Sequence, residues 1–378
     1  MNNTYCQYKA FFCLRVVVSV LFFLIFFDGE GEGMKSAEAA SGGDGQMARK
    51  LSLADLAVSP NGDVIAFQYN SGPNLSNPAI ALLEWRTGKL TRIPNPSDSW
   101  LSSPSFSNDG KKIAVSITKD HISSEIAIVD LSTMHVSQVT NSESEVRFNK
   151  PRRRVKFDPI FSNDDNSIVY LEYDVLVSNR RHISIVNVAD GKESSVIDES
   201  HGFYSIFKPF FSSSGEIYFN AEGPADALLK SKVNSLWEKN SEFNELSYKV
   251  KIGDGADLLF PDFQVKMKGK GHLSNIHSLA GAENAKIIVF SSAIDPNTKG
   301  LYEHEIYKYD NGSAIQLTNI KSFIHYVRIS RSGDVVAFLE DPTRHKNFDI
   351  SIFDARDGRI REANLLTELA SNPDFLNN

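Results

Sequence analysis

Three histidines come closest to a metal-binding set in this chain. The sequence holds nine histidines, and His272, His277 and His325 each lie just before a predicted strand. Imidazole nitrogens bind divalent metals, and a metal held in this way could assist a reaction on an acidic sugar. We interpret these histidines as ordinary loop and strand residues, and we predict neither a metal nor a cofactor.

The familiar catalytic motifs are missing from the sequence. There is no Gly-x-Ser-x-Gly elbow, no His-Glu-x-x-His pair, no Cys/His zinc set and no phosphate-binding glycine loop before a helix. Asp254 and Asp257, in the acidic and aromatic segment 253–263, resemble part of a calcium loop whose terminal Glu is absent. We interpret this segment as an insertion of the kind that often carries binding residues.

The charge of the chain excludes one class of partner. The formal net charge is −7, with acidic residues spread along the sequence, which argues against nucleic-acid binding. One basic run, Lys150-Pro-Arg-Arg-Arg-Val-Lys156, opposes this trend. It is either a solvated loop or a local anion site that faces an acidic partner or glycan.

The elements that must position any site are short strands. Residues 100–140 read as four strands separated by polar turns, the first of which is Ser107-Asn-Asp-Gly110. Glycine takes positive φ at such a turn without steric cost. Four antiparallel strands in about forty residues form one meander, which cannot bury both faces alone and needs neighbouring copies.

The copies recur along the chain. The strand-turn-strand half returns around Gly62, Gly215 and Gly333, with Asn166 expected to replace the glycine in one copy and a weaker copy at 276–290. The spacing of these turns is roughly fifty residues, which suits one four-stranded unit with its loops. We therefore predict an all-β fold, a six-bladed β-propeller of four-stranded antiparallel blades. We also expect residues 51–56 to close the ring by pairing with residues 349–354.

The repeat resembles that of TolB-type β-propellers. The resemblance rests on Pro-Ser-Phe-Ser-Asn-Asp-Gly-Lys-Lys-Ile-Ala-Val (104–115), on Glu-Ile-Ala-Ile-Val-Asp…Gln-Val-Thr (125–140) and on Ile-Tyr-Lys-Tyr-Asp…Gln-Leu-Thr (306–318). It covers roughly residues 50 to 363. The repeat implies architecture more than function, because it occurs in periplasmic scaffolds, in gating domains of peptidases and in a few lyases.

The chain begins with a segment that resembles an export signal. Lys9 and Arg15 precede the apolar stretch Val16–Phe27, and Ala37-Glu-Ala39 is a small-x-small cleavage pattern. We expect residues 1–39 to be a cleaved signal peptide or, through residues 10–27, an uncleaved membrane anchor. Residues 40–49 would be a linker, 50–363 the propeller and 364–378 a C-terminal tail. Both cysteines lie in the first segment, which suits a periplasmic protein.

A binding face follows from the resemblance. In TolB-type repeats the start of the innermost strand, with the loop before it, lines the mouth of the central channel. Carried onto this chain, that implies a rim made of Asp55, Trp100, Lys156, Tyr204, Lys208, His277, His325, Tyr326 and Arg328. Trp, Tyr and Arg supply most interface energy, and the three cations would favour an acidic peptide or glycan. These side chains could equally fill the channel as packing.

Two functional hypotheses remain. The first is a periplasmic, monomeric scaffold without enzymatic activity that binds another envelope protein or a peptide. The second is a metal-assisted lyase or hydrolase that acts on acidic sugars through histidines and arginines at the channel mouth. A weaker third is the gating domain of a peptidase.

Overall fold

The computed structural model describes residues 50–376, apart from the segments 223–244, 260–264 and 294–303 and shorter gaps. The shorter gaps are 73–76, 120–122, 143–145, 148–149, 152–153, 176–177, 202, 204, 213, 268–269, 274–275, 283–286, 311 and 342–347. The described residues fall in one compact unit, residues 36–378. None of their helices is long and apolar enough to cross a membrane.

In the five repeats whose first turn the structure describes, the first hairpin turns on a serine and a residue with positive φ. Gly62, at φ 78°, donates its N–H to the Ser59 carbonyl at 2.9 Å, and Ser59 Oγ accepts the Val64 N–H at 2.9 Å. The turns that begin at Ser107, Ser212 and Ser330 repeat this hydrogen bond with Gly110, Gly215 and Gly333.

One turn replaces the glycine, although at a different residue from the one expected. Asp165, at φ 59°, donates its N–H to the Ser162 carbonyl at 3.0 Å. The prediction that Asn166 holds this position is therefore wrong. A short aspartate side chain tolerates the left-handed region better than most residues, so the turn forms without glycine.

The first and last sheets are separate four-stranded meanders. Their strand orders are β1-β2-β3-β4 and β26-β27-β28-β29, and every neighbouring pair is antiparallel. The strands are β1 (Lys50–Val58), β2 (Val64–Gly72), β3 (Asn77–Glu84), β4 (Lys89–Arg92), β26 (Phe323–Ile329), β27 (Val335–Asp341), β28 (Asp349–Asp354) and β29 (Arg359–Glu362).

The next two meanders share one eight-stranded sheet. A parallel bridge between Val155 and Ser124 joins β11 to β7. The strands are β5 (Trp100–Phe106), β6 (Lys112–Thr118), β7 (Ser124–Asp130), β8 (His135–Gln138), β11 (Arg154–Phe161), β12 (Ser167–Asp174), β13 (Ser178–Asn187) and β14 (Glu193–Ile197). A two-stranded hairpin, β9 (Val146–Arg147) with β10 (Lys150–Pro151), lies between them in the sequence.

The remaining strands form sheets of five and six. The first contains β15 (Ser205–Ile206), β16 (Phe210–Phe211), β17 (Ile217–Glu222), β18 (Glu245–Val250) and β19 (Asp257–Leu258), and the turn η1 (Glu199–His201) precedes it. The second contains β20 (Val265–Met267), β21 (Lys270–Leu273), β22 (Ile276–Ala282), β23 (Ile287–Ala293), β24 (His304–Asp310) and β25 (Ser313–Gln316).

The prediction of six four-stranded blades is wrong. Among the described strands, two sheets have four strands, and the others have two, five, six and eight. Three local features account for the difference. The Val155–Ser124 bridge fuses two meanders, and β20 adds a parallel strand beside β25 at Met267 and Ala314. Pro209 lies between β15 and β16, which are two short strands that both pair with β17.

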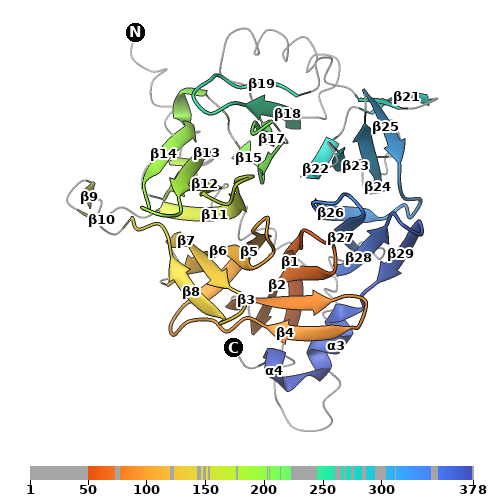
Figure 1. Cartoon of the computed structure of the whole chain (residues 1–378), viewed down its shortest axis with the longest axis horizontal. Coiled ribbons are helices and arrows are strands. Elements are labelled where there is room, and N and C mark those ends of the chain that lie inside the picture. Colours follow the sequence, from red (N-terminus) through yellow and green to blue (C-terminus); the bar gives the residue numbers. More distant parts are fainter. Residues whose placement is uncertain are drawn as a thin grey trace, which may run out of the picture. The chain divides into compact units, whose positions relative to one another are not determined.

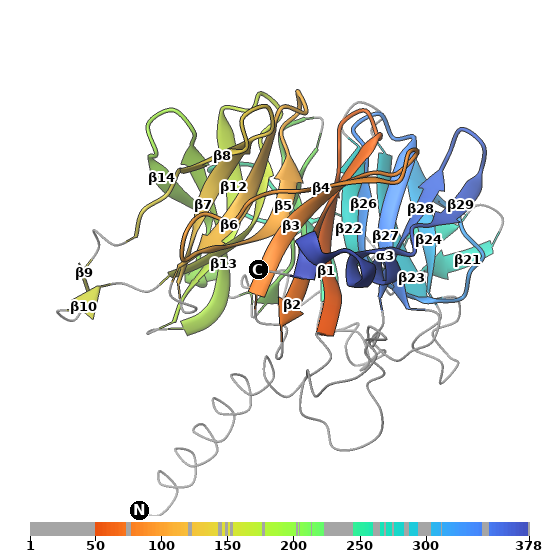
Figure 2. The same ribbon diagram turned by 90° about the horizontal axis from the view of Figure 1, so that it is seen from below.

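The all-β propeller architecture itself is present. The sheets surround a central axis, with β1, β5, β11, β22 and β26 nearest to it and β4, β8, β14 and β29 on the outside (Figure 1). The side view shows the strands running between the two faces of the propeller (Figure 2). The apolar core lies between neighbouring sheets, as where Ile80 packs with Leu101 and Ile113.

The first and last sheets meet without a shared strand. Among the described strands β1 pairs with β2, so the predicted pairing of residues 51–56 with residues 349–354 is wrong. Side-chain and turn contacts join the two sheets instead. Arg86 Nη2 lies 3.2 Å from Asp354 Oδ2, and the Ser332 N–H donates to the Pro60 carbonyl at 3.3 Å.

The C-terminal residues complete this junction. Two short helices, α3 (Leu365–Ser371) and α4 (Pro373–Leu376), bury Leu365, Leu369 and Phe375 in the core that the first and last sheets share. The Phe375 ring meets that of Tyr69 edge-on, with centroids 5.7 Å apart. No strand pairing connects the first and last sheets among the described residues, so apolar packing helps to stabilise their junction.

Candidate functional site

The strands nearest the axis bulge at one recurring position. The pairing of β5, β11, β22 and β26 with the next strand shifts register there, and the bulged residue has positive φ. These residues are Ser103, Asp158, Ser278 and Tyr326, with φ between 50° and 52°. A bulge re-aims side chains, and positive φ in a residue as large as tyrosine is rare, so the position is structurally specialised.

Charged residues occupy this position in three repeats. Asp55, Asp158 and Lys208 each lie four residues before the turn serine of their own repeat, as Ser103 and Tyr326 do. The register of β1 also shifts beside Asp55. The repeat therefore directs two carboxylates and one ammonium group to equivalent places around the axis.

Asp55 links two cations from distant parts of the sequence. Its Oδ2 lies 3.0 Å from Lys208 Nζ, and its Oδ1 lies 3.2 Å from Arg328 Nη2. The three side chains expose 5%, 9% and 13% of their surface, respectively. The Leu56 N–H also donates to Asp55 Oδ1 at 2.8 Å. Because water solvates these charges poorly, the ion pairs must stabilise them instead.

The environment of this cluster shifts two pKa values. Burial raises the pKa of the Asp158 carboxyl; the Lys208 ammonium opposes this rise, and the Asp55 carboxylate adds to it. Burial lowers the pKa of Lys208, whereas Asp55 supports its charged form. Arg328 and Arg181 also favour the ionised form of Asp158. The charges of this cluster therefore interact with one another where water solvates them poorly.

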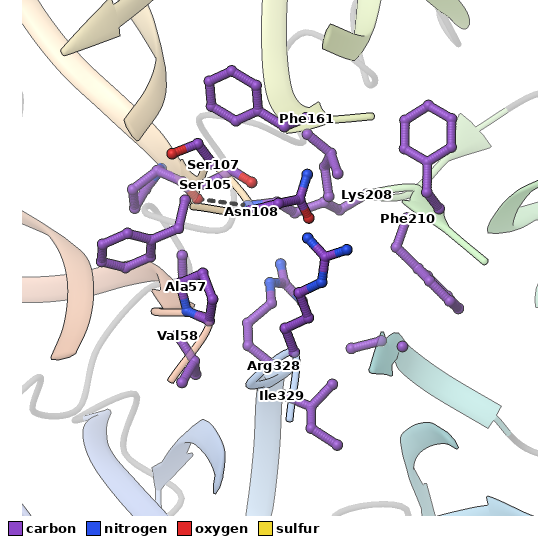
Figure 3. Close-up of a pocket in the computed structure, with 18 of the residues that line it drawn as sticks. Ala57, Val58, Ser105, Ser107, Asn108, Phe161, Lys208, Phe210, Arg328 and Ile329 are labelled. Carbon is purple, nitrogen blue, oxygen red and sulfur yellow. Dashed lines mark hydrogen bonds between the residues drawn. The ribbon is translucent and has the colours of Figure 1, made fainter. Parts of the chain in front are cut away.

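A cavity of about 140 Å³ lies beside the cluster. Strands of separate sheets contribute its wall, as the differently coloured ribbons around Ala57, Ser105, Phe161, Phe210 and Arg328 show (Figure 3). Its lining is Ala57, Val58, Pro60, Pro104, Ser105, Phe106, Ser107, Asn108, Ile160, Phe161, Asn163, Lys208, Phe210, Phe211, Ala280, Gly281, Arg328, Ile329 and Arg331.

The structure brings together part of the predicted rim. Asp55, Lys208 and Arg328 form one cluster, and the Arg328 guanidinium lies 5.8 Å from the Tyr326 ring centroid. The His325 ring centroid lies 5.9 Å from that of Tyr326. These five residues, drawn from three sheets, therefore make one continuous set.

The other predicted rim residues lie elsewhere or outside the described residues. Trp100 is half-buried at the start of β5, and it does not line the cavity. Tyr204 lies outside the described residues. His277 belongs to β22, but its side chain is not among those described.

Lys156 is buried in an ion-pair network instead of lining the cavity. Its Nζ lies 3.0 Å from Glu125 Oε2 and 2.8 Å from Glu193 Oε2, and the Tyr170 hydroxyl also donates to Glu193. Ser124 Oγ accepts the Lys156 N–H at 3.0 Å, beside the bridge that joins β7 to β11. This network ties together the two meanders of the eight-stranded sheet.

Sequence reasoning missed Asp158, Asn108 and Arg331. The first could have been found from its place four residues before a turn serine, which it shares with Asp55 and Lys208. The other two follow the turn serines Ser107 and Ser330, at the end of the inner strand. The predicted rim emphasised the start of that strand, whereas the cavity lies near its end.

The metal hypotheses find no assembled site in the part of the chain that the structure describes. Within those residues, no three His, Cys, Asp or Glu side chains converge as a metal-binding group. The His325 ring packs against Phe323 and Phe348, with centroids 4.5 Å and 5.3 Å away. The side chains of His272 and His277 are not among those described.

Comparison with known proteins defines the class first. The chain is an all-β propeller. Its structure is similar to that of a puromycin-hydrolyzing peptidase of Mycobacterium tuberculosis, with a TM-score of 0.50 and 12% sequence identity. The superposition covers 87% of this chain and 53% of the peptidase. TolB of Acinetobacter baumannii covers 69% of it at 17% identity, with 55% of that protein matched and a TM-score of 0.44. Likeness at such identities concerns the fold alone.

The repeat is of the TolB type. The Tol-Pal system protein TolB of Francisella tularensis subsp. mediasiatica is 39% identical over 89 residues, which confirms the resemblance seen in the repeat motifs. The TolB of strain FSC 198 of subsp. tularensis matches at the same identity and length. The match spans 23% of this chain and 20% of the first relative, so it is local. No family model matches the chain.

Proposed function

We propose that this protein is an exported binding module of the cell envelope, which holds another protein or a peptide at the centre of its propeller. The observation that carries the proposal is the convergence of Lys208 and Arg328 on Asp55 beside the cavity. The cavity wall takes residues from every large sheet, so the site depends on the assembled propeller and on no single repeat.

The composition of the site favours a polypeptide guest. Arginine and aromatic side chains contribute most of the energy at protein interfaces, and Arg328, Tyr326 and Phe210 lie in or next to this cavity. The cationic lining within an acidic chain favours an acidic segment of the partner. The curated relatives are named as Tol-Pal system proteins, which supports a partner in the envelope.

Export rests on the sequence. The basic start, the apolar stretch Val16–Phe27 and the small-x-small pattern at Ala37–Ala39 support delivery to the periplasm. Osmotic shock tests this part: a protein that begins near Ala40 is released into the periplasmic fraction. Recovery only with detergent and with an intact N-terminus means that residues 10–27 act as an anchor.

Capture from an envelope extract tests the binding role. The variant Arg328→Ala is expected to weaken capture by at least tenfold, which corresponds to about 1.4 kcal/mol. Lys89→Glu, an exposed charge reversal on the outer strand β4, is the control and is expected to retain capture. Loss of capture in the control alone would place the site on the outer strands and overturn the proposal.

A melting-temperature assay with manganese distinguishes the lyase hypothesis from the binding module. An enzyme that uses a divalent metal gains stability from manganese by mass action, so its melting temperature rises with metal concentration. The binding module is expected to show no such rise. Stabilisation by manganese that is lost in His325→Ala would favour the enzyme over the scaffold.

A further inference from the structure

Among the residues that the structure describes, the charged side chains that line the cavity are all cations. They are Lys208, Arg328 and Arg331, and this described lining contains neither aspartate nor glutamate. Two carboxylates that are not part of the described lining interact with these cations. Asp55 pairs with Lys208 and Arg328, and Asp158 interacts electrostatically with the same two cations. The described lining therefore presents positive charge to the cavity.

The two central cations keep unused hydrogen-bond donors. Lys208 Nζ donates to Asp55 Oδ2 at 3.0 Å and to the Pro104 carbonyl at 3.2 Å, which occupies two of its three N–H groups. Arg328 donates from Nη1 to the Val327 carbonyl and from Nη2 to Asp55. Its Nε is buried without a hydrogen-bond partner. Nη1 and Nη2 each carry two N–H groups and use one of them, so each keeps one donor for a bound acceptor.

The rest of the wall is largely apolar. Phe106, Phe161, Phe210, Phe211 and Ile329 surround the cations. An apolar wall lowers the local dielectric constant, which strengthens the attraction between a bound anion and the cations. It also offers contact surface for an apolar group attached to that anion, which inorganic ions lack.

We propose that the cavity is a carboxylate site, which binds a carboxylate attached to an aromatic or other apolar group between Lys208 and Arg328. The planar guanidinium of arginine matches the two oxygens of a carboxylate, and the phenyl rings pack against its carrier. This inference rests on the proposed function and names the chemical group of the guest that the propeller recognises. Both a chain terminus and an acidic side chain beside an aromatic residue carry such a group.

Calorimetric titration of the full protein with small probes tests the proposal. N-acetylphenylalanine carries a terminal carboxylate, and its amide has the same shape without the charge. Acetyl-phenylalanyl-glutamyl amide carries the carboxylate on a side chain. We expect at least one acid to bind tenfold or more tightly than the neutral amide, and the tighter of the two acids identifies the source. Equal affinity for the amide, or for inorganic phosphate, would overturn the proposal.

Variants separate the cavity from the rest of the surface. Arg328→Gln is expected to weaken binding of the preferred acid at least tenfold, and Arg331→Gln, which leaves the Asp55 pairs in place, provides a second test if the first variant folds poorly. Arg361→Gln, on the outer strand β29 where Arg361 pairs with Asp357, is the matched control. Unchanged binding in both cavity variants contradicts the proposal. Acid binding without capture of any envelope protein upholds the cavity and refutes the proposed function.

Discussion

The carboxylate of Asp55 lies 3.0 Å from the ammonium group of Lys208, although 153 residues separate them in the sequence. The same carboxylate holds Arg328 from the last sheet at 3.2 Å. One side chain of the first strand thus connects three sheets at the axis of the propeller. Such a contact contributes to stability and to the shape of the cavity at once.

Asp55→Asn is expected to destabilise the fold. The substitution leaves two poorly solvated cations close together without the carboxylate between them, and the loss of one partner of a buried ion pair costs about 3 kcal/mol or more. Urea titration gives the free energy of unfolding. Asp63→Asn is the control, because its pair with Arg86 is about half exposed, and it should change stability by less than about 1 kcal/mol. Equal effects of the two substitutions would show that the Asp55 cluster contributes no special stability.

Lys156→Met is expected to destabilise the eight-stranded sheet in a pH-dependent way. Burial raises the pKa of Glu125, but the Lys156 ammonium and hydrogen bonds from Thr140 and Ser142 outweigh it, so this pKa lies below its usual value of 4.5. The contribution of ionised Glu125 is therefore present above pH 4.5 and is lost as the pH falls through the lowered pKa.

Removal of Lys156 takes away the largest effect that favours the ionised carboxyl, so that only the hydrogen bonds from Thr140 and Ser142 still oppose burial. Melting temperatures measured at several pH values should show the largest loss near neutral pH and a smaller loss below pH 4.5. Lys119→Met, an exposed control, should change little at any pH. A loss that does not vary with pH would contradict the role given to Lys156.

Gly62→Ala tests the contact between the first and last sheets. A Cβ at Gly62 would lie 2.7 Å from Val335 Cγ2, whereas a Cβ at Gly88 meets nothing within 4 Å, and both glycines have similar positive φ. Each substitution costs about 1 kcal/mol through the backbone, and overpacking at Gly62 adds about 1–3 kcal/mol. Similar unfolding free energies for the two variants would mean that the sheets do not approach as closely as described.

The sequence predicts the strands better than their assembly. Turn serines followed by a residue with positive φ, as at Ser59 and Gly62, mark the first hairpin in the five repeats whose turn the structure describes, and they need only local information. The joining of two meanders depends on Lys156 meeting Glu125 and Glu193, which lie far apart in the sequence. Such long-range pairs have no local signature, so the number and size of the sheets could not be derived.

The candidate site was predictable in part for a similar reason. The position four residues before the turn serine recurs with the repeat, and it contains Asp55 and Lys208. Which end of the inner strand borders a cavity depends on how the bulges turn the side chains. The bulges depend on backbone angles, such as the φ of 52° at Asp158 and at Tyr326, and the sequence pattern does not specify these angles.

Photo-crosslinking in the cells that make the protein tests the central claim most directly. Tyr326 beside the axis and Ile315 on the outer strand β25 each expose 41% of their surface, so they form a matched pair for replacement by benzoylphenylalanine. If the partner binds at the centre of the propeller, ultraviolet light produces a covalent adduct with another envelope protein from position 326 and none from position 315. Adducts from position 315 alone would contradict the account.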